Sequence, residues 1–223
     1  MFRFTNVNND WNERSNVSNY WNERFKNEGM IWGREPSPTA RHAKYFFEIH
    51  NIQTVLFPGS GYGRNTKALS SQFIVDAVEL SADAATLARE WDSRSHVIEE
   101  SVLEMNLNKQ YDGIYCYDLL HLFLKDDREQ LIDNCIHHLR ENGLMYFTCF
   151  SDEDPNCGEG KEIECGTYEY KTGKYAHFFS EEDLREHFHA LHVVETGSVV
   201  EKLTNLNQES HQYLLRYIVL MKK

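Results

Sequence analysis

Short apolar runs alternate with amphipathic segments along most of this chain. Between the runs, apolar residues recur at helical spacing, most clearly at Leu131, Cys135 and Leu139. Each run has the length of a buried strand, and the five lie at residues 54–57, 73–79, 96–99, 111–117 and 144–150. This alternation predicts an α/β fold with a doubly wound, mostly parallel sheet, because parallel strands need helical crossovers.

Serines that suit helix N-caps mark where several helices begin. Ser18, Ser37 and Ser81 each precede an amphipathic stretch, so we expect helices to start directly after them. A longer helix is predicted from Asp126 to Gly143, since glycine commonly ends a helix.

The N-terminal residues repeat one phrase. Trp-Asn-Glu-Arg occurs at 11–14 and again at 21–24. Two copies do not make a repeat array. We expect the second copy to lie on the helix that follows Ser18 and the first copy to form a loosely ordered arm.

The C-terminal third departs from the alternation. Residues 151–179 are polar and acidic, and they predict a hairpin around 168–175. Ser180 is expected to begin a helix, and residues 213–221 read as a strand. Because no segment resembles a linker, we expect a single domain over residues 1–223.

Composition narrows the class of protein. The formal net charge of −12 argues against non-specific nucleic-acid binding, which needs a basic surface. No apolar run reaches the length of a membrane span, and the polar N-terminus lacks a signal peptide's apolar core. The five cysteines contain no C-x-x-C pair, which favours reduced thiols. We therefore expect a cytoplasmic protein without a membrane partner; the oligomeric state stays open.

A glycine-rich loop, PGSGYGR at 58–64, follows the first predicted strand. Gly59, Gly61 and Gly63 differ in spacing from the dinucleotide fingerprint, which would place glycine where Arg64 stands. Many cofactor loops carry an acid just before the glycines, but here Phe57 is followed by proline. Ligands of open α/β sheets bind beyond the carboxyl ends of the strands, so this loop is a candidate cofactor site.

Glu79 ends the second predicted strand, roughly 20 residues after the loop. An acid at that place can accept hydrogen bonds from both ribose hydroxyls of a nucleoside. The alternative is that Glu79 only caps the helix that begins after Ser81. The loop and the spacing together favour ribose binding.

Four segments in order resemble the class I S-adenosylmethionine-dependent methyltransferases. They read VLFPGSGYGR, AVELSADAATLA, YDGIYCYDLLHLF and LRENGLMYFTCF. Within that class, the chain resembles the thiopurine methyltransferase-like and tellurite-resistance groups, the latter through GxGxE-I-E and HFFSEEDL phrases at 158–163 and 177–184. The resemblance implies a Rossmann-like seven-stranded sheet with an antiparallel last strand. It divides the domain into an arm and lid (1–36), a cofactor-binding core (37–150), an insertion over the acceptor pocket (151–179) and a C-terminal helix and strands (180–223).

The resemblance also assigns cofactor contacts. S-adenosyl-L-methionine would meet the loop with its methionine part and ribose, Glu79 with its ribose hydroxyls and Leu80 with its adenine. Ser101 stands where an acid usually contacts the adenine, so that contact is open. The full set of implied cofactor residues is Pro58, Gly59, Ser60, Gly61, Glu79, Leu80, Ser101, Val102 and Tyr117.

The chemistry expected of such a site is alignment of acceptor and methyl carbon, exclusion of water and, for some acceptors, proton removal. Because a sulfonium favours aromatic faces, the lid or substrate side is assigned to Tyr20, Trp21, Trp32 and Arg64. The candidate catalytic residues are Asp118, His121 and His177, and no base is needed for a thiol or soft anion.

His187, His189 and His192 lack the carboxylate or thiol spacing of a metal site, so we expect a solvated helix end and no metal. The acceptor is expected to be a small molecule. A protein acceptor and a non-catalytic cofactor-binding protein remain alternatives. A nicotinamide oxidoreductase is disfavoured by the loop spacing and by the lack of a Tyr-x-x-x-Lys pair.

Overall fold

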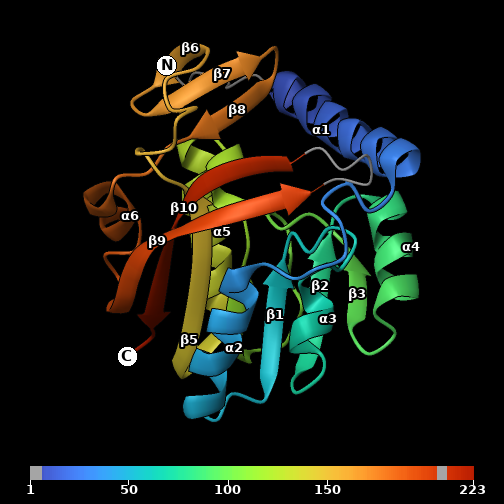
Figure 1. Ribbon diagram of the computed structural model, residues 1–223, viewed down its shortest axis with the longest axis vertical. Helices are drawn as coiled ribbons and strands as arrows, with labels where there is room; N and C mark the ends of the chain where they lie inside the picture. The colour runs from blue at the N-terminus through green and yellow to red at the C-terminus, as the bar shows by residue number, and fades with distance from the viewer. Residues whose placement is uncertain (1–6, 205–209) are drawn as a thin grey trace.

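The fold is given by a computed structural model that describes the backbone of residues 7–204 and 210–223, and side chains from residue 18 onward in those ranges. A seven-stranded sheet forms its centre, in the order β3-β2-β1-β4-β5-β10-β9 (Figure 1). The strands β1 to β5 are parallel, and β10 is antiparallel to both β5 and β9. The strand bounds are β1 Thr54–Pro58, β2 Ile74–Glu79, β3 His96–Glu99, β4 Tyr111–Cys116, β5 Leu139–Phe150, β9 His192–Thr204 and β10 Ser210–Met221. The predicted fold class is confirmed.

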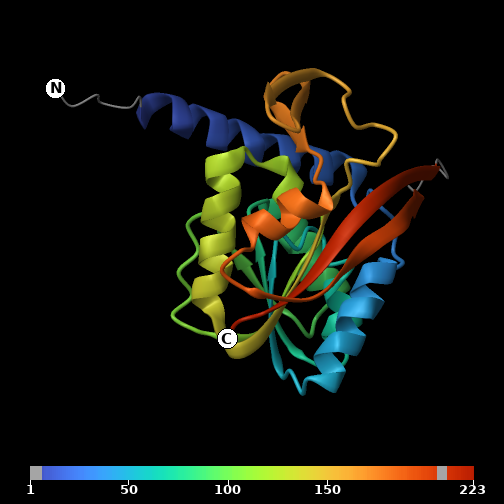
Figure 2. The same cartoon turned by 90° about the vertical axis from the view of Figure 1, so that its left-hand side faces the viewer.

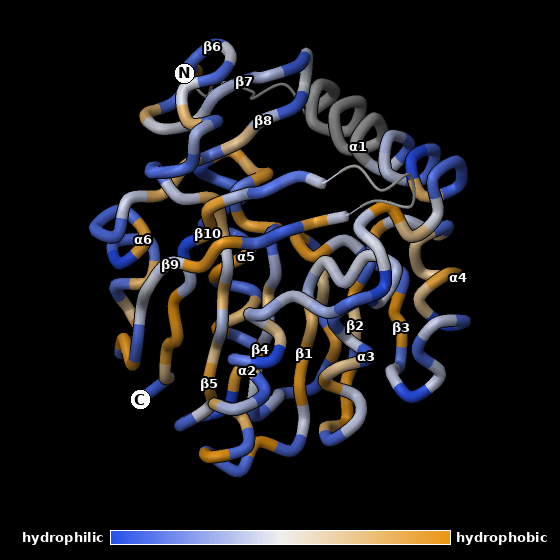
Figure 3. Tube along the Cα trace, in the orientation of Figure 1, coloured by the Kyte–Doolittle hydropathy of each residue, from blue (hydrophilic) through white to orange (hydrophobic). Residues whose placement is uncertain are grey.

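Helices cover both faces of this sheet (Figure 2). One face packs against α2 (Pro38–Ile49), α3 (Thr66–Leu69) and α4 (Ala82–Trp91), and the other against α5 (Lys125–His138) and α6 (Glu181–His187). Burial on both faces explains the near-continuous apolar runs of the inner strands, which Figure 3 shows for β1. Among the described residues, no helix combines the length and apolarity needed to cross a membrane.

Two predicted helix starts are confirmed by their caps. The Ser37 side chain accepts a hydrogen bond from the Thr39 N–H at 3.1 Å, and Ser81 accepts one from the Ala84 N–H at 3.2 Å. The first helix differs from the prediction, because α1 runs from Val7 to Glu28 and includes both WNER phrases. The first phrase is therefore not a loose arm, although its side chains lie outside the described residues.

The long helix ends earlier than predicted. It stops at His138 rather than at Gly143, because Leu139 already pairs with Tyr111 as the first residue of β5. His138 accepts the Leu107 N–H at 3.1 Å, which fixes the helix end beside the loop before β4. Long-range strand pairing therefore overrode the local stop signal.

The insertion forms a separate three-stranded sheet of β6 (Lys161–Glu164), β7 (Thr167–Lys171) and β8 (Lys174–His177). The predicted hairpin is its β7–β8 pair. Both α1 and this small sheet lie at the edge where the parallel strands end (Figure 1). That is the edge at which open α/β sheets bind ligands.

A buried carboxylate joins β2 to β4. Asp76 accepts hydrogen bonds from the Tyr111 hydroxyl and the Lys109 ammonium, each at 2.7 Å. Burial acts to raise the pKa of Asp76, but these two donors outweigh it and lower the pKa. We expect Tyr111→Phe to reduce the free energy of unfolding by about 1.5–3 kcal/mol at pH 7, the scale for a hydrogen bond to a charged group.

Urea denaturation of the Tyr111→Phe variant measures this loss, with Tyr45→Phe as the matched control, since Tyr45 is 56% exposed. Because the folded-state pKa of Asp76 is depressed, its contribution is present above the unfolded pKa and is lost as pH falls through the folded value. The difference between wild type and Tyr111→Phe should therefore shrink on acidification. Equal stability at pH 7 would contradict the role of this hydrogen bond.

Candidate cofactor and active site

The glycine loop has a backbone that only glycine adopts readily. Gly59, Gly61 and Gly63 have φ values of 67°, 56° and 82°, all in the left-handed region. The N–H groups of Gly59 and Ser60 both donate to the Val78 carbonyl, at 2.9 and 3.1 Å, so the loop folds back over the end of β2. This conformation explains the alternating glycines that distinguish the loop from the dinucleotide fingerprint.

The loop fits a ligand that approaches the backbone closely. A Cβ at Gly59 would stand 2.6 Å from the Leu119 side chain, whereas one at Gly61 would meet only Phe25, at 3.8 Å. The Ser60 hydroxyl is buried and has no hydrogen-bond partner among the residues that the structure describes. An unpaired buried hydroxyl is costly, which makes Ser60 a fitting contact for a polar ligand group.

The Glu79 carboxylate anchors the backbone of the glycine loop. One of its carboxylate oxygens accepts the Gly61 N–H and the other accepts the Ser81 N–H, both at 2.8 Å. Burial raises the pKa of Glu79, while these backbone donors act in the opposite direction. The residue therefore supports both the loop and the start of α4. Each carboxylate oxygen has a second lone pair, so these bonds leave acceptor capacity for ribose hydroxyls.

The adenine side of the predicted site lies next to Glu79. The Glu100 N–H donates to the Glu79 carbonyl at 3.2 Å, which sets the segment after β3 beside the end of β2. Leu80 is 39% exposed there, as expected of a residue that packs on a ligand. Val102 is buried, and the Ser101 hydroxyl accepts the Leu103 N–H at 3.3 Å.

Two residues after the end of β4, Asp118 carries a carboxylate on an unusual backbone conformation. Asp118 has a φ of 48°, unusual for a residue other than glycine. Its N–H donates to the Thr148 hydroxyl at 2.9 Å, and that hydroxyl donates back to the Asp118 carboxylate at 2.7 Å. Burial, together with the charge of Glu201, raises the pKa of Asp118 to about 7. The site thus contains a fixed carboxylate that can exchange a proton near neutral pH.

A buried ion pair connects the loop to the C-terminal strands. Arg64, which directly follows the last loop glycine, donates to the Tyr117 hydroxyl at 2.8 Å and to the Glu201 carboxylate at 3.3 Å. Glu201 also accepts the Ser37 hydroxyl at 2.6 Å. Burial would lower the pKa of Arg64, but Tyr117 and Glu201 outweigh it and raise the pKa.

Sequence reasoning missed Glu201, and it placed Arg64 with the lid or substrate rather than in an ion pair. The only available signal was an acid within an otherwise apolar alternation near residue 200. Charge pairing between residues 137 positions apart leaves no local trace.

Aromatic residues of the N-terminal segment cover the glycine loop. Phe25 and Trp32 pack against Tyr62 of the loop, with ring centroids 6.0 and 6.1 Å apart. Trp21 stacks on Phe25 at 5.8 Å. The Tyr62 hydroxyl donates to the Gly33 carbonyl at 2.7 Å, which fixes this segment to the loop. Tyr62 is a second residue that sequence reasoning passed over, although it stands between two of the loop glycines.

Further contacts fix α1 next to the glycine loop. The Ser81 hydroxyl donates to the Asn22 side chain at 2.7 Å, which joins α1 to the start of α4. Tyr20 lies against Trp21, and the Lys174 ammonium of the small sheet sits 3.6 Å from the Tyr20 ring centre. The structure therefore brings the predicted lid residues Tyr20, Trp21 and Trp32 together near the loop.

The two candidate histidines have different surroundings. His121 is buried on the Phe150 ring, and burial with nearby His177 lowers its pKa to about 3. His177 is hydrogen-bonded through one ring nitrogen to Thr167 and through the other to Asp183, both at 2.7 Å. A pKa near 3 makes His121 a weak proton acceptor at neutral pH, and His177 has no ring nitrogen free. The geometry favours Asp118 over both.

The predicted solvated histidine cluster is only partly solvated. His187 donates toward Asp183 and accepts a hydrogen bond from Arg128 at 3.2 Å, whereas His189 and His192 are exposed. Within the described side chains, no group of three or more His, Cys, Asp or Glu residues is arranged to hold a metal ion.

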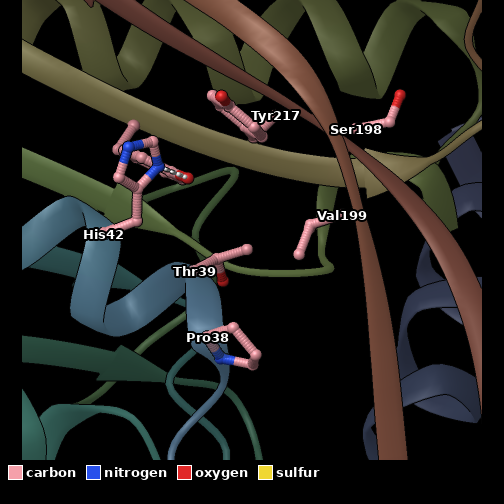
Figure 4. Close-up of a pocket in the computed structure, with 7 residues that line it drawn as sticks. Pro38, Thr39, His42, Ser198, Val199 and Tyr217 are labelled. Atoms are coloured by element: carbon pink, nitrogen blue, oxygen red, sulfur yellow. Dashed lines mark hydrogen bonds between the residues drawn. The ribbon is translucent and has the colours of Figure 1, made fainter.

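A cavity of about 200 Å³ lies elsewhere, between α2 and the last two strands (Figure 4). His42 hydrogen-bonds the Tyr146 hydroxyl beside it at 3.0 Å. The cavity is lined by Pro38, Thr39, His42, Tyr146, Ser198, Val199 and Tyr217, none of which belongs to the glycine loop or the predicted lid.

We expect Arg64→Met to lower the free energy of unfolding by about 3–5 kcal/mol, because it leaves the Glu201 carboxylate buried without its partner. The double variant Arg64→Met/Glu201→Gln should recover part of that loss, since the uncompensated charge is then removed. Denaturant titrations of Arg64→Met, Glu201→Gln and the double variant measure the difference. A double variant as unstable as the sum of the two single variants would contradict a direct coupling.

Comparisons with known proteins agree with this geometry. Residues 55–143 match the family model of a methyltransferase domain, which spans the glycine loop, Glu79 and Asp118. No curated protein sequence matches the chain significantly.

Solved structures share its fold at low sequence identity. A 1,6-didemethyltoxoflavin-N1-methyltransferase from Burkholderia thailandensis, with bound 1,6-didemethyltoxoflavin and S-adenosylhomocysteine, superposes with a TM-score of 0.70 at 19% identity, covering 100% of this chain and 93% of that chain. A structure described for conversion of a disulfide bond into a thioacetal group during echinomycin biosynthesis gives 0.71 at 16% identity, with 93% and 92% covered.

TehB from Haemophilus influenzae gives a TM-score of 0.61 at 16% identity; the match covers 82% of this chain and 62% of that one. The family match, the strand order and the loop geometry lead to one conclusion. Residues 55–143 belong to a methyltransferase domain, and the chain has the fold of the class I S-adenosylmethionine-dependent methyltransferases.

Proposed function

We propose that the protein transfers a methyl group from S-adenosyl-L-methionine to a small-molecule acceptor by in-line displacement. The observation that carries this proposal is the left-handed glycine loop, which the Glu79 carboxylate holds at the edge where β1, β2 and β4 end. When bound, the cofactor supplies an electrophilic methyl group with a neutral thioether as its leaving group.

The residues around the loop fit the parts of that cofactor. Glu79 would hold the ribose hydroxyls, because its carboxylate has unused lone pairs. Leu80, Ser101 and Val102 would enclose the adenine. The methionine part would meet Pro58, Gly59, Ser60 and Gly61, with Tyr117 nearby. The buried, unpartnered Ser60 hydroxyl is the favoured acceptor for the methionine ammonium in place of the missing acid.

The N-terminal segment would act as the lid of the site. Trp21 and Trp32 lie at the loop through Phe25 and Tyr62. The Arg24 guanidinium lies over both indole rings, so this aromatic cluster accommodates a positive charge, as a sulfonium would require. Arg64 would contribute indirectly, by fixing the Tyr117 hydroxyl with its guanidinium. Closure of this segment would exclude water from the reacting groups.

Asp118 would receive a proton from acceptors that must lose one. Its carboxylate is fixed by Thr148, and a proton acceptor works best when its pKa lies near the operating pH. Thiolates and chalcogen oxyanions would need no such step.

The proposal also covers the substrate class, the cellular location and the domain organisation. The acidic chain disfavours nucleic acid as a substrate, and a cytoplasmic location is part of the proposal. We also propose one domain, with residues 1–36 as arm and lid, 37–150 as the cofactor core, 151–179 over the acceptor and 180–223 completing the sheet. A protein acceptor and a silent cofactor-binding protein are the alternatives that turnover assays would separate.

Loss of the Glu79 carboxylate should weaken binding of S-adenosylhomocysteine. We expect Glu79→Ala to reduce the binding free energy by about 1–3 kcal/mol, because charge-assisted hydrogen bonds to the ribose and the loop are lost. Calorimetry measures this change. Glu99→Ala is the matched control, since Glu99 pairs with Glu79 in the sheet register but ends an adjacent strand and points to Arg89. Unchanged affinity in Glu79→Ala would refute its ribose role.

Asp118→Asn tests the proton acceptor without requiring a known substrate. Because the folded-state pKa of Asp118 is raised, its ionisation costs stability that is retained at low pH and lost as pH rises from about 4 to about 7. Asp118→Asn should therefore be more stable than wild type at pH 8, by about 1–3 kcal/mol, and similar to it at pH 3.

Thermal unfolding across that pH range measures the effect, and asparagine tolerates the left-handed backbone of this position. For an acceptor that must lose a proton, methyl transfer by the wild type should rise through a midpoint near pH 7, and Asp118→Asn should lack that rise. A stability difference independent of pH would show that Asp118 titrates normally.

A further inference from the structure

Aromatic rings line the region between Asp118 and the small sheet. Phe150 ends β5, and its ring is nearly parallel to those of Phe178 and Tyr213, with centroids 5.6 and 5.5 Å away and interplanar angles of 22° and 20°. We call these three residues the aromatic wall. His121 also stacks on Phe150, at 3.7 Å, so the middle ring is held in a fixed orientation.

The wall lies next to Asp118, because Phe150 is two residues along β5 from Thr148, whose hydroxyl holds the Asp118 carboxylate, and Tyr213 stacks on Phe150. The Tyr213 side chain is half-buried, and no hydrogen bond of its hydroxyl is observed among the described residues. Burial raises the pKa of Tyr213, with nearby Asp154 and Asp118 adding to the rise and Arg24 opposing it.

The small sheet supplies the opposite side. Tyr170 of β7 is 53% exposed as a whole residue, and burial of its hydroxyl, followed by the influence of Tyr20 and Tyr213, raises its pKa. Tyr168 packs edge-on against Phe178 at 6.0 Å. Asp118, Phe150 and Tyr213 each keep part of their surface exposed, so aromatic side chains of the insertion and the last strand remain accessible beside this carboxylate.

Three cations of this region have partners. Arg64 pairs with Glu201, the Lys174 ammonium lies on the Tyr20 ring, and Arg24 lies over Trp21 and Trp32. The carboxylates of Asp118 and Glu201 add negative charge beside them. These carboxylates would repel a compact oxyanion, whereas a flat neutral molecule would match the ring faces.

We propose that the methyl acceptor is a planar aromatic or heteroaromatic molecule, stacked on Tyr213 with an ionisable N–H or O–H directed at Asp118. This inference rests on the proposed methyltransferase function and specifies its acceptor class. Parallel stacking fixes the plane of the acceptor, and a directed hydrogen bond fixes its rotation, so the nucleophilic atom is aligned for in-line attack.

The transfer balances with these groups alone. The acceptor N–H or O–H gives its proton to the Asp118 carboxylate, and the electron pair left on that nitrogen or oxygen forms the new bond to the methyl carbon. The pair of the broken carbon–sulfur bond stays on sulfur. The products are the methylated acceptor, S-adenosylhomocysteine and a protonated Asp118, and no oxidant or further reactant is needed.

The test uses the full-length protein in two stages. Calorimetry first measures binding of S-adenosylhomocysteine. The loaded protein is then titrated with lumazine, hypoxanthine and 2-naphthol, with 2-mercaptoethanol and selenite as non-aromatic comparisons. In parallel, formation of S-adenosylhomocysteine from S-adenosyl-L-methionine is followed by mass spectrometry for each compound. We expect binding and turnover among the aromatic compounds, and binding without turnover for 1,3-dimethyllumazine, which lacks the ionisable N–H.

Variants of Tyr213 test whether the aromatic wall binds the acceptor. Tyr213→Leu should weaken binding of the aromatic acceptor about tenfold, the equivalent of about 1.4 kcal/mol, because the stacking face is lost. It should leave the affinity for S-adenosylhomocysteine unchanged, and Tyr213→Phe should keep both affinities. Tyr217→Leu, on the same strand but beside the α2 cavity, is the matched control.

The outcomes separate the two proposals. If S-adenosylhomocysteine does not bind, the methyltransferase proposal fails and this inference fails with it. If it binds, but only thiol or selenite is methylated, the function stands and the aromatic acceptor is wrong. The selectivity of the wild-type protein decides this point even where a variant does not fold.

Discussion

The carboxylate of Glu79 is the constraint on which the site depends. It accepts one backbone N–H from the glycine loop and one from the start of α4, so a single buried group fixes both the ligand-facing loop and the helix behind it. The loop can obey this constraint because its three glycines take left-handed backbone angles. Phe25 and Trp32 of the N-terminal segment contact this loop through Tyr62, so their positions depend on that anchoring.

A second buried interaction connects the site to segments outside residues 55–143, which match the methyltransferase domain. The Arg64–Glu201 pair joins the residue after the loop to β9, and Ser37 extends it to the start of α2. The same charges act on Asp118, since Glu201 raises and Arg64 lowers its pKa. Segments at both ends of the chain therefore set the electrostatics of the strand end where proton transfer would occur.

The sequence predicted the sheet, most helix starts and the loop because these depend on local patterns. Periodicity reveals which residues are buried, and Ser37 and Ser81 cap helices through bonds to residues two and three positions away. The end of α5 could not be predicted in this way, since Leu139 joins a strand through pairing with Tyr111. The extent of α1 was also missed, because its polar first half has no apolar face to signal a helix.

The sequence by itself determined the fold class, the cofactor loop and the place of Glu79, because each is written in residues close together in the chain. Only the tertiary structure decided the proton affinity of Asp118 and the aromatic surroundings of the proposed acceptor site. Asp118 gains its raised pKa from burial and from a carboxylate on β9, and Tyr213 reaches Phe150 only because β10 pairs antiparallel to β5. Such properties depend on distances between segments far apart in sequence, and no local pattern contains them.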